Sequence, residues 1–210
     1  MFGIHDLGLF IVSGLLLNIM PGPDSLLIMT RSATQGARAG CTAALGIGAG
    51  VFVHVFAAAL GLSAILSTSA TAFAVVKYIG AAYILYLAVT LLRSRPGGPA
   101  APLTVAPQPY RNIFAQGFLT NALNPKVAIF FLAFVPQFID ADAPNKALAF
   151  IVLGCVFNFN GMLWCNALAL FTASASARLK VSPLVSLWLN RATGGLFIWL
   201  GVKLALSKSN

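Results

Sequence analysis

The sequence predicts an all-α integral membrane protein of six transmembrane helices, arranged as two inverted three-helix repeats with broken first and fourth helices. Three observations lead to this fold class. Only 8% of the 210 residues are charged, whereas soluble domains carry about 25%. Long runs without any charged residue recur along the chain. Residues that break helices occur at corresponding places in the two halves of the chain.

The composition excludes several other classes. Hydrophobic residues make up 59% of the chain, so its few charges cannot cover the surface of a soluble globule. Disorder requires the opposite composition. The apolar runs are continuous and do not alternate with polar residues, which favours helices over a barrel. The net charge of +9 comes from scattered basic residues, so we expect no nucleic-acid partner.

The charge-free runs define the transmembrane spans, since a span needs about 20 apolar residues. We expect them at 7–29, 42–63, 72–92, 112–138, 146–172 and 187–206. The first run lacks a basic start and a small-residue cleavage site, and it continues into a Pro-Gly-Pro-Asp segment. We therefore interpret it as a retained span and not as a signal peptide.

The distribution of basic residues predicts the orientation of these spans, because cytoplasmic loops are enriched in Lys and Arg. Eight basic residues fall on one side: Arg31, Arg38, Arg93, Arg95, Arg111, Arg178, Lys180 and Arg191. Four fall on the other: Lys77, Lys146, Lys203 and Lys208. The odd-numbered loops are therefore expected in the cytoplasm and both termini outside.

A Pro- and Gly-rich segment divides the chain into two halves. The expected units are a first repeat at 1–93, a cytoplasmic linker at 94–110 and a second repeat at 111–210. Three cysteines, Cys41, Cys155 and Cys165, form no paired motif. They are interpreted as packing residues, and no metal site or cofactor is expected.

Two segments combine a glycine, an asparagine and a proline break at matching offsets. In span one, Gly14 and Asn18 precede Pro21-Gly22-Pro23-Asp24. In span four, Gly117 and Asn121 precede Asn124-Pro125-Lys126. Such paired interruptions in two three-helix halves indicate a transporter binding site.

Proline removes a backbone donor, so each break frees carbonyl groups on one side and amides on the other. Such groups can hold the ammonium and carboxylate of a zwitterion. The predicted substrate-binding residues are Pro21, Gly22, Pro23, Asp24, Asn121, Asn124, Pro125 and Lys126.

Asp24 and Lys126 are the only ionised residues near these breaks. A charge at a helix centre costs about 2.5–3.5 kcal/mol on insertion scales, so each needs compensation. Asp24 either only caps the second half-helix or also takes part in substrate or proton binding. Lys126 either binds the substrate carboxylate or has a structural role, in which it pairs with Asp24 or freed carbonyls or extends to the interface.

Other polar residues within the spans form a second group of candidates. His54 is a candidate for proton coupling together with Asp24, and the alternative is a hydrogen-bonded core histidine. Asn18, Asn158 and Trp164 are candidates for polar lining of the site, with hydrogen bonding between helices as the alternative. No catalytic set of residues occurs, so we do not expect an enzyme.

The chain resembles the lysine-exporter (LysE) superfamily, and within it the threonine/homoserine efflux branch (RhtB type). The resemblance rests on Pro21-Gly22-Pro23-Asp24, the glycine-rich segment from Gly36 to Gly50, and Asn124-Pro125-Lys126. It continues through Phe130-Phe131, Pro136-Gln137-Phe138 and Arg191-x-x-Gly194 with Gly201. Only the linker 94–110 is poorly covered. Met20 departs from the family pattern, in which many members have Asn before the first proline.

This resemblance implies export of neutral amino acids such as threonine, homoserine or leucine across the bacterial inner membrane, driven by the proton gradient. The partners it implies are an amino-acid substrate, protons and the lipid bilayer, and a homo-oligomer stays an open alternative. Two other functions also stay open: export of another small solute on the same scaffold, and a membrane assembly or electron-transfer factor. The last would require paired cysteines in the broken spans, which have none.

Overall fold

The computed structural model describes residues 2–62 and 106–175, with single positions between 71 and 93 and between 191 and 202. All secondary-structure elements within 2–62 and 106–175 are helices, apart from one isolated β-bridge. This confirms the all-α prediction for this part of the chain. The spans predicted at 72–92 and 187–206, and most of the linker 94–110, lie outside the described residues.

The first broken helix consists of α1 (Leu7–Ile19) and α2 (Pro23–Gln35), which meet at a bend of 55°. Proline explains the break, because the rings at positions 21 and 23 lack the backbone donors that would continue α1. Pro23 occupies the first position of α2, where a missing N–H costs little. The sequence predicted this break near Met20–Pro23, and the structure has it there.

The second broken helix begins with α6 (Tyr110–Ala122) and continues into α7 (Pro125–Ile129). A π-helical turn, η2 (Phe130–Phe134), and a 3₁₀ turn, η3 (Val135–Phe138), complete it. The bend at its break is 45°. Each bent pair, taken as one unit, is long and apolar enough to cross a membrane once.

Two unbroken helices accompany these pairs. They are α3 (Ala37–Ala57), which continues into the π-helical turn η1 (Ala58–Leu62), and α8 (Lys146–Ala175). Both are long and apolar enough to cross a membrane, so the described residues hold two to four candidate spans. α3 starts before the predicted 42–63 span because Gly36, at φ +83°, ends α2 and lets the next helix begin at once.

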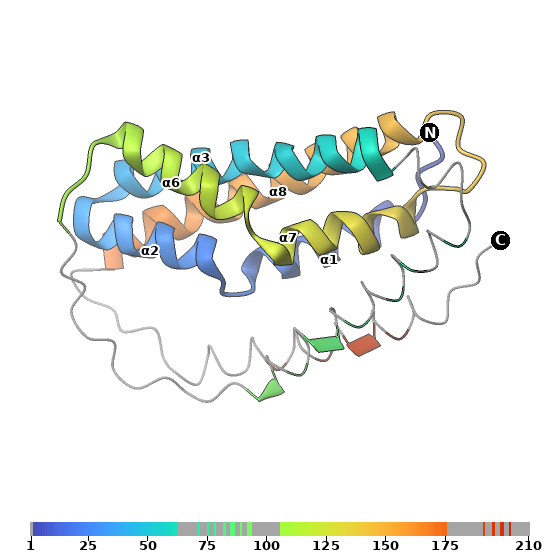
Figure 1. Cartoon of the computed structure of the whole chain (residues 1–210). Helices are drawn as coiled ribbons and strands as arrows, with labels where there is room; N and C mark the ends of the chain where they lie inside the picture. The colour runs from blue at the N-terminus through green and yellow to red at the C-terminus, as the bar shows by residue number, and fades with distance from the viewer. Residues whose placement is uncertain are drawn as a thin grey trace.

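The broken helices run side by side in opposite directions (Figure 1), so that their two breaks lie next to each other. α3 packs against α6 and α8. Close approach of α3 and α6 depends on glycine, since a Cβ atom at Gly46 would run into the Phe114 carbonyl and one at Gly117 into the Ala43 carbonyl. The result is a bundle whose interior contains both breaks.

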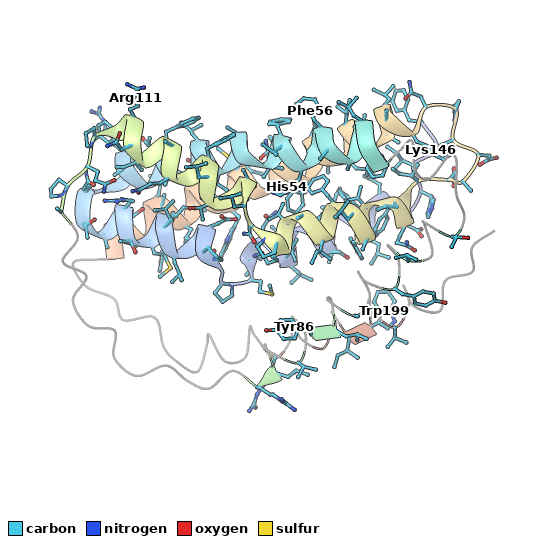
Figure 2. All side chains as sticks on the ribbon, viewed as in Figure 1. His54, Phe56, Tyr86, Arg111, Lys146 and Trp199 are labelled. Atoms are coloured by element: carbon cyan, nitrogen blue, oxygen red, sulfur yellow. The ribbon has the colours of Figure 1, made fainter. Side chains whose placement is uncertain are left out.

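The ends of the bundle carry different polar groups. Figure 2 shows Arg111 at one end and Lys146 at the other. At the Lys146 end, Ile4 forms an isolated bridge with Ile139, and His5 lies 3.9 Å from Asp140. The carboxylates of Asp6 and Asp140 therefore both lie next to His5.

Candidate functional site

Lys126 lies at the point where the two broken helices meet. Pro21 has no N–H, so the carbonyl of Leu17, four residues earlier, loses its helical donor. The Nζ atom of Lys126 donates to this carbonyl at 3.1 Å and to the Met20 carbonyl at 3.3 Å. A charged side chain from the second half of the chain therefore completes the backbone of the first half.

His54 has the corresponding role at the other break. Pro125 cannot supply the helical donor for the carbonyl of Asn121, four residues earlier, and this carbonyl accepts instead from the Asn124 N–H at 2.8 Å. The His54 Nε2 atom lies 2.8 Å from that carbonyl oxygen. A carbonyl can only accept, so the imidazole carries a proton on Nε2 and donates it. The observed contact of His54 is therefore that of a buried, hydrogen-bonded histidine, which is the alternative to proton coupling raised by the sequence.

Asp24 lies in the first turn of α2 and does not cap the helix. The capping position belongs to Gly22, and no side chain caps there. The Asp24 Oδ2 atom instead accepts from the Nδ2 atoms of Asn121 at 2.9 Å and Asn124 at 3.1 Å. The alternative in which Asp24 only caps the half-helix is therefore wrong. Its carboxylate joins the two halves across the breaks.

Asn124 is the residue that caps a half-helix here. Its Oδ1 atom accepts from the backbone N–H of Lys126 at 3.0 Å, which satisfies one free amide of α7. The Nδ2 group of the same side chain reaches Asp24. Asn124 therefore fixes the position of the Asp24 carboxylate relative to the second break.

Asp24 and Lys126 do not pair directly. The Lys126 ammonium donates to backbone carbonyls, and the Asp24 carboxylate accepts from two asparagine amides. The sequence left several structural roles open for Lys126, and the structure shows the one in which its ammonium group binds freed carbonyls. It does not show the one in which Lys126 pairs with Asp24. The two opposite charges lie in one polar centre without neutralising each other by contact.

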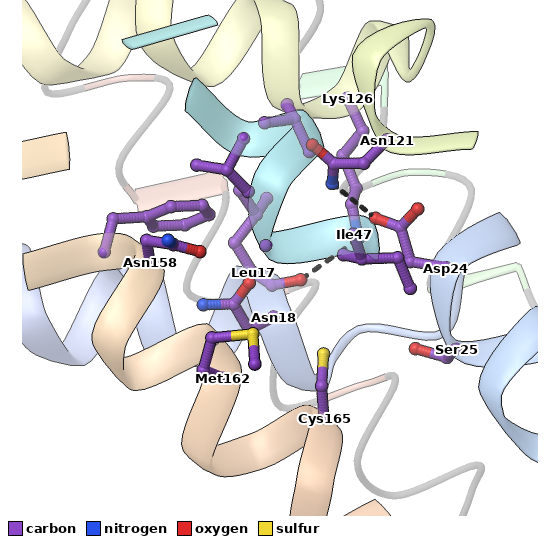
Figure 3. A pocket seen from close by; sticks show the side chains of 15 residues that line it. Leu17, Asn18, Asp24, Ser25, Ile47, Asn121, Lys126, Asn158, Met162 and Cys165 are labelled. Atoms are coloured by element: carbon purple, nitrogen blue, oxygen red, sulfur yellow. Dashed lines mark hydrogen bonds between the residues drawn. The ribbon is translucent and has the colours of Figure 1, made fainter. Parts of the chain in front are cut away.

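A small cavity adjoins this polar centre (Figure 3), with a volume of about 20 Å³. That volume admits about one water molecule and no amino acid, so this conformation is closed around the site. Its polar lining comes from Asn18, Asp24, Ser25, Asn121, Lys126 and Asn158. Its apolar lining comes from Leu17, Ile47, Val51, Val127, Phe157 and Met162.

Three buried polar atoms at the cavity have no hydrogen-bond partner within the part of the chain that the structure describes. They are the Oδ1 atoms of Asp24 and Asn121 and the Nδ2 atom of Asn18. Two are acceptors and one is a donor. Because unpaired buried groups cost free energy, they indicate where the charged ends of a ligand would gain most.

Some of the predicted binding residues lie away from the cavity wall. Pro21, Gly22, Pro23, Asn124 and Pro125 do not line it, and the three prolines are exposed. They shape the site through the backbone. A Cβ atom at Gly22 would lie 3.3 Å from the Lys126 Nζ atom, so this glycine makes room for the ammonium group. Trp164 and His54 also lie outside the cavity lining.

The sequence reasoning missed several residues that line the cavity. On α8, Gly161, Met162 and Cys165 follow Asn158 at spacings of three, four and seven residues. Residues at these spacings share one helix face, so Asn158 could have identified the other three. The α3 residues Ile47, Gly48 and Val51 carried no such polar marker.

The arrangement favours binding of a small zwitterion over metal chemistry. Within the described ranges, no group of three His, Cys, Asp or Glu side chains is placed to hold a metal ion. The unpaired acceptors suit an ammonium group, and the unpaired amide suits a carboxylate. The apolar wall suits an aliphatic side chain.

Comparison with known proteins identifies relatives that cover nearly the whole chain. Residues 15–208 match the family described as LysE type translocator. The leucine efflux protein of Salmonella typhimurium is 26% identical over 208 residues, which cover 99% of this chain and 98% of that protein. An uncharacterized membrane protein of Pseudomonas aeruginosa is 30% identical over 207 residues, which cover 97% and 96%. No solved structure matches.

Proposed function

Because the chain belongs to the LysE type translocator family, we propose that it exports a neutral amino acid across the membrane that it spans. Membership of a translocator family confirms the expectation of a transporter and not an enzyme. The observation that carries the proposal is the polar centre between the two helix breaks, where unpaired acceptors and an unpaired donor adjoin an apolar wall.

The substrate is held by its two charged ends. Its ammonium group lies between the Oδ1 atoms of Asp24 and Asn121, and its carboxylate accepts from Asn18 and from the Lys126 ammonium when the site opens. Pro21, Gly22, Pro23, Asn124 and Pro125 set the backbone around these groups. Asn158 provides a further polar contact, and Trp164 supports the wall from outside the cavity.

Leucine fits this site better than threonine or homoserine. The wall beside the polar centre is formed by aliphatic, aromatic and thioether side chains. A threonine or homoserine hydroxyl would lose its hydrogen bonds to water against this wall, whereas a leucine side chain would lose none. The leucine efflux proteins among the relatives support this choice.

Protons are the coupling ion, and Asp24 is the group that exchanges them. Its carboxylate lies at the break within the first bent helix pair, with one oxygen unpaired among the described residues. Protonation removes a buried charge whose cost is high at this depth. His54, which is held on the Asn121 carbonyl, is the second candidate for proton transfer.

The proposed architecture is the full six-helix form with two inverted three-helix repeats, joined by a cytoplasmic linker at 94–110. The opposite directions of the two broken helices support it (Figure 1). The protein is placed in the bacterial inner membrane with both termini outside. Export of a different small solute is the alternative, whereas membership of a translocator family disfavours an assembly or electron-transfer factor.

The test is counterflow of labelled amino acids in proteoliposomes that contain the purified full chain. We expect leucine to be exchanged, and transport of none of a panel of neutral amino acids would contradict the proposed cargo.

The coupling role is tested with Asp24→Asn, which keeps the size of the side chain and one oxygen acceptor. We expect this variant to keep exchange of leucine while losing efflux driven by a pH gradient. A variant that still shows full proton-driven efflux would contradict a coupling role for Asp24.

A further inference from the structure

Arg31 is a buried cation at the end of the bundle where α2, α6 and residues 106–109 meet. Its side chain is only 4% exposed. None of its observed partners is charged: Nη1 donates to Gln35 Oε1 at 3.3 Å and to the Ala106 carbonyl at 3.4 Å, and Nη2 donates to Gln116 Oε1 at 2.9 Å. The Nε atom is buried and has no partner within the described residues.

The charge of Arg31 has no anion to balance it among the acidic residues of the chain. The chain has four, and all are in the described part. Asp6 and Asp140 contact His5 at the other end of the bundle, and Asp142 is exposed in the turn before α8 at that same end. Asp24 contacts Asn121 and Asn124. A buried guanidinium group held only by neutral oxygens is an expensive arrangement that an incoming carboxylate would relieve.

The side of the Arg31 guanidinium group that carries Nε and Nη2 is the side that binds carboxylates in a bidentate manner. The Nε and Nη2 atoms of a guanidinium group face the same way and match the two oxygens of a carboxylate. Here Nε is unpaired and Nη2 is held by a single neutral amide oxygen of Gln116. A carboxylate could bind both atoms by displacing this one contact.

Displacement of Gln116 would loosen the end of the bundle. Gln116 Nε2 donates to Gln108 Oε1 at 2.9 Å, and Gln108 exchanges two hydrogen bonds of 3.0 Å with Gln35 of α2. These amides tie residues 106–109 to both α2 and α6. The same contact that holds Arg31 in its closed state therefore also holds this end of the two helices together.

Arg31 lies on the same helix as Asp24 of the polar centre. Residues 24, 28 and 31 share one face of α2, and Arg31 is about 10 Å along the helix from Asp24. Ile28 lies between them and is fully buried. A ligand that opened the Arg31 end and moved Ile28 would reach Asp24 directly.

We propose that Arg31 is a carboxylate-receiving site at the entrance of the transporter, where a substrate carboxylate replaces Gln116 on the guanidinium group before the substrate reaches Asp24. The site takes small monocarboxylates, and its use by an amino acid rests on the proposed export function. Arg31 thereby selects substrates that carry a free carboxylate. In the closed state, neutral amide groups occupy the place of this carboxylate.

The probe is 4-methylpentanoate, which has the carboxylate and side chain of leucine but no ammonium group. Its binding to the purified full chain is measured by thermal shift and calorimetry. We expect Arg31→Gln to weaken binding by roughly ten-fold or more, because two hydrogen bonds to a charged group are lost. Arg38→Gln, which changes an exposed arginine of the same region, serves as the matched control and should bind as the wild type does.

Gln116→Glu separates recognition from folding. The new carboxylate would pair with Arg31 permanently, so the melting temperature should not fall while binding of 4-methylpentanoate decreases by about ten-fold. The proposal would be overturned if the wild type did not bind 4-methylpentanoate. It would also be overturned if the Arg31→Gln and Gln116→Glu variants bound the probe as strongly as the wild type does. Leucine counterflow in the same preparations tests the export function separately, since the acid can bind even where leucine is not carried.

Discussion

Pro21 and Pro125 each remove the helical donor of a carbonyl group four residues earlier, and a side chain from another helix hydrogen-bonds to each of these carbonyls. Lys126 of α7 takes the Leu17 carbonyl, and His54 of α3 takes the Asn121 carbonyl. Hydrogen bonds from the side chains of other helices stabilise irregular backbone inside a membrane, where no lipid group can replace the lost donor. At the residue scale, the breaks are therefore maintained by side chains and not by the prolines alone.

Replacement Lys126→Met tests this arrangement. The substitution keeps an unbranched chain but leaves the Leu17 and Met20 carbonyls unpaired, at a cost of about 1–3 kcal/mol for each group. We expect leucine counterflow to fall by at least about ten-fold. Lys146→Met, at the start of α8, is the control for loss of a lysine and should retain the wild-type rate. A Lys126→Met rate above half that of the wild type would contradict the structural importance of this contact.

The sequence could identify which residues are unusual but not their partners. Asp24 and Lys126 stand out because charges are rare in spans, and both line the cavity. Their partners follow from the angle and register of two helix pairs that are distant in the chain, which no local pattern specifies. Because proline removes the donor of the carbonyl four residues earlier, the sequence could have predicted that the Leu17 and Asn121 carbonyls lose a helical hydrogen bond. It could not predict that Lys126 reaches the first and that Asn124 N–H and His54 reach the second.

At the scale of the elements, the bend between α1 and α2 creates the site. Pro21→Ala restores an amide that can donate to the Leu17 carbonyl, so α1 can extend and compete with Lys126 for it. We expect leucine transport to decrease by about three- to ten-fold in proteoliposomes. Pro144→Ala, in the exposed loop before α8, is the matched control and should be neutral. Unchanged transport in Pro21→Ala would show that the break does not depend on this proline.

The close packing of α3 on α6 is the second element-scale feature that can be tested. Gly46→Ala introduces a Cβ atom against the Phe114 carbonyl and should lower the melting temperature. Gly8→Ala in α1 meets open space and should be neutral or stabilising by about 0.5–1 kcal/mol, because alanine is the better helix former. Equal shifts for the two variants would contradict the packing of these helices.

At the scale of the whole molecule, the charge-free runs predicted the four apolar segments that the described residues hold as candidate spans, although α2 continues to Gln35, six residues beyond the predicted end of the first span. The breaks of the first and fourth spans and the extent of α8 follow from charge-free runs and prolines, because these are local properties. The start of α3 differs by five residues, because Gly36 ends α2 and the next helix begins directly after it, before the apolar run. The closed state of the cavity was not predictable, because it depends on how four helices pack together.

The cavity of about 20 Å³ is too small for leucine, so the molecule must open and close during transport. Cys165 lines this cavity and is buried, whereas Cys155 lies on the same helix and is exposed. Cys165 therefore lies at the cavity, and Cys155 lies away from it. A substrate that binds between the breaks should shield the first thiol and leave the second unaffected.

Binding of the substrate between the two helix breaks is therefore tested by the rate at which N-ethylmaleimide labels Cys165 in a variant whose other two cysteines are replaced by alanine. We predict that a saturating concentration of the amino acid active in counterflow slows labelling several-fold, while labelling of a Cys155-only variant stays constant. A Cys165 labelling rate that the transported amino acid does not change would contradict binding of the substrate between the two helix breaks.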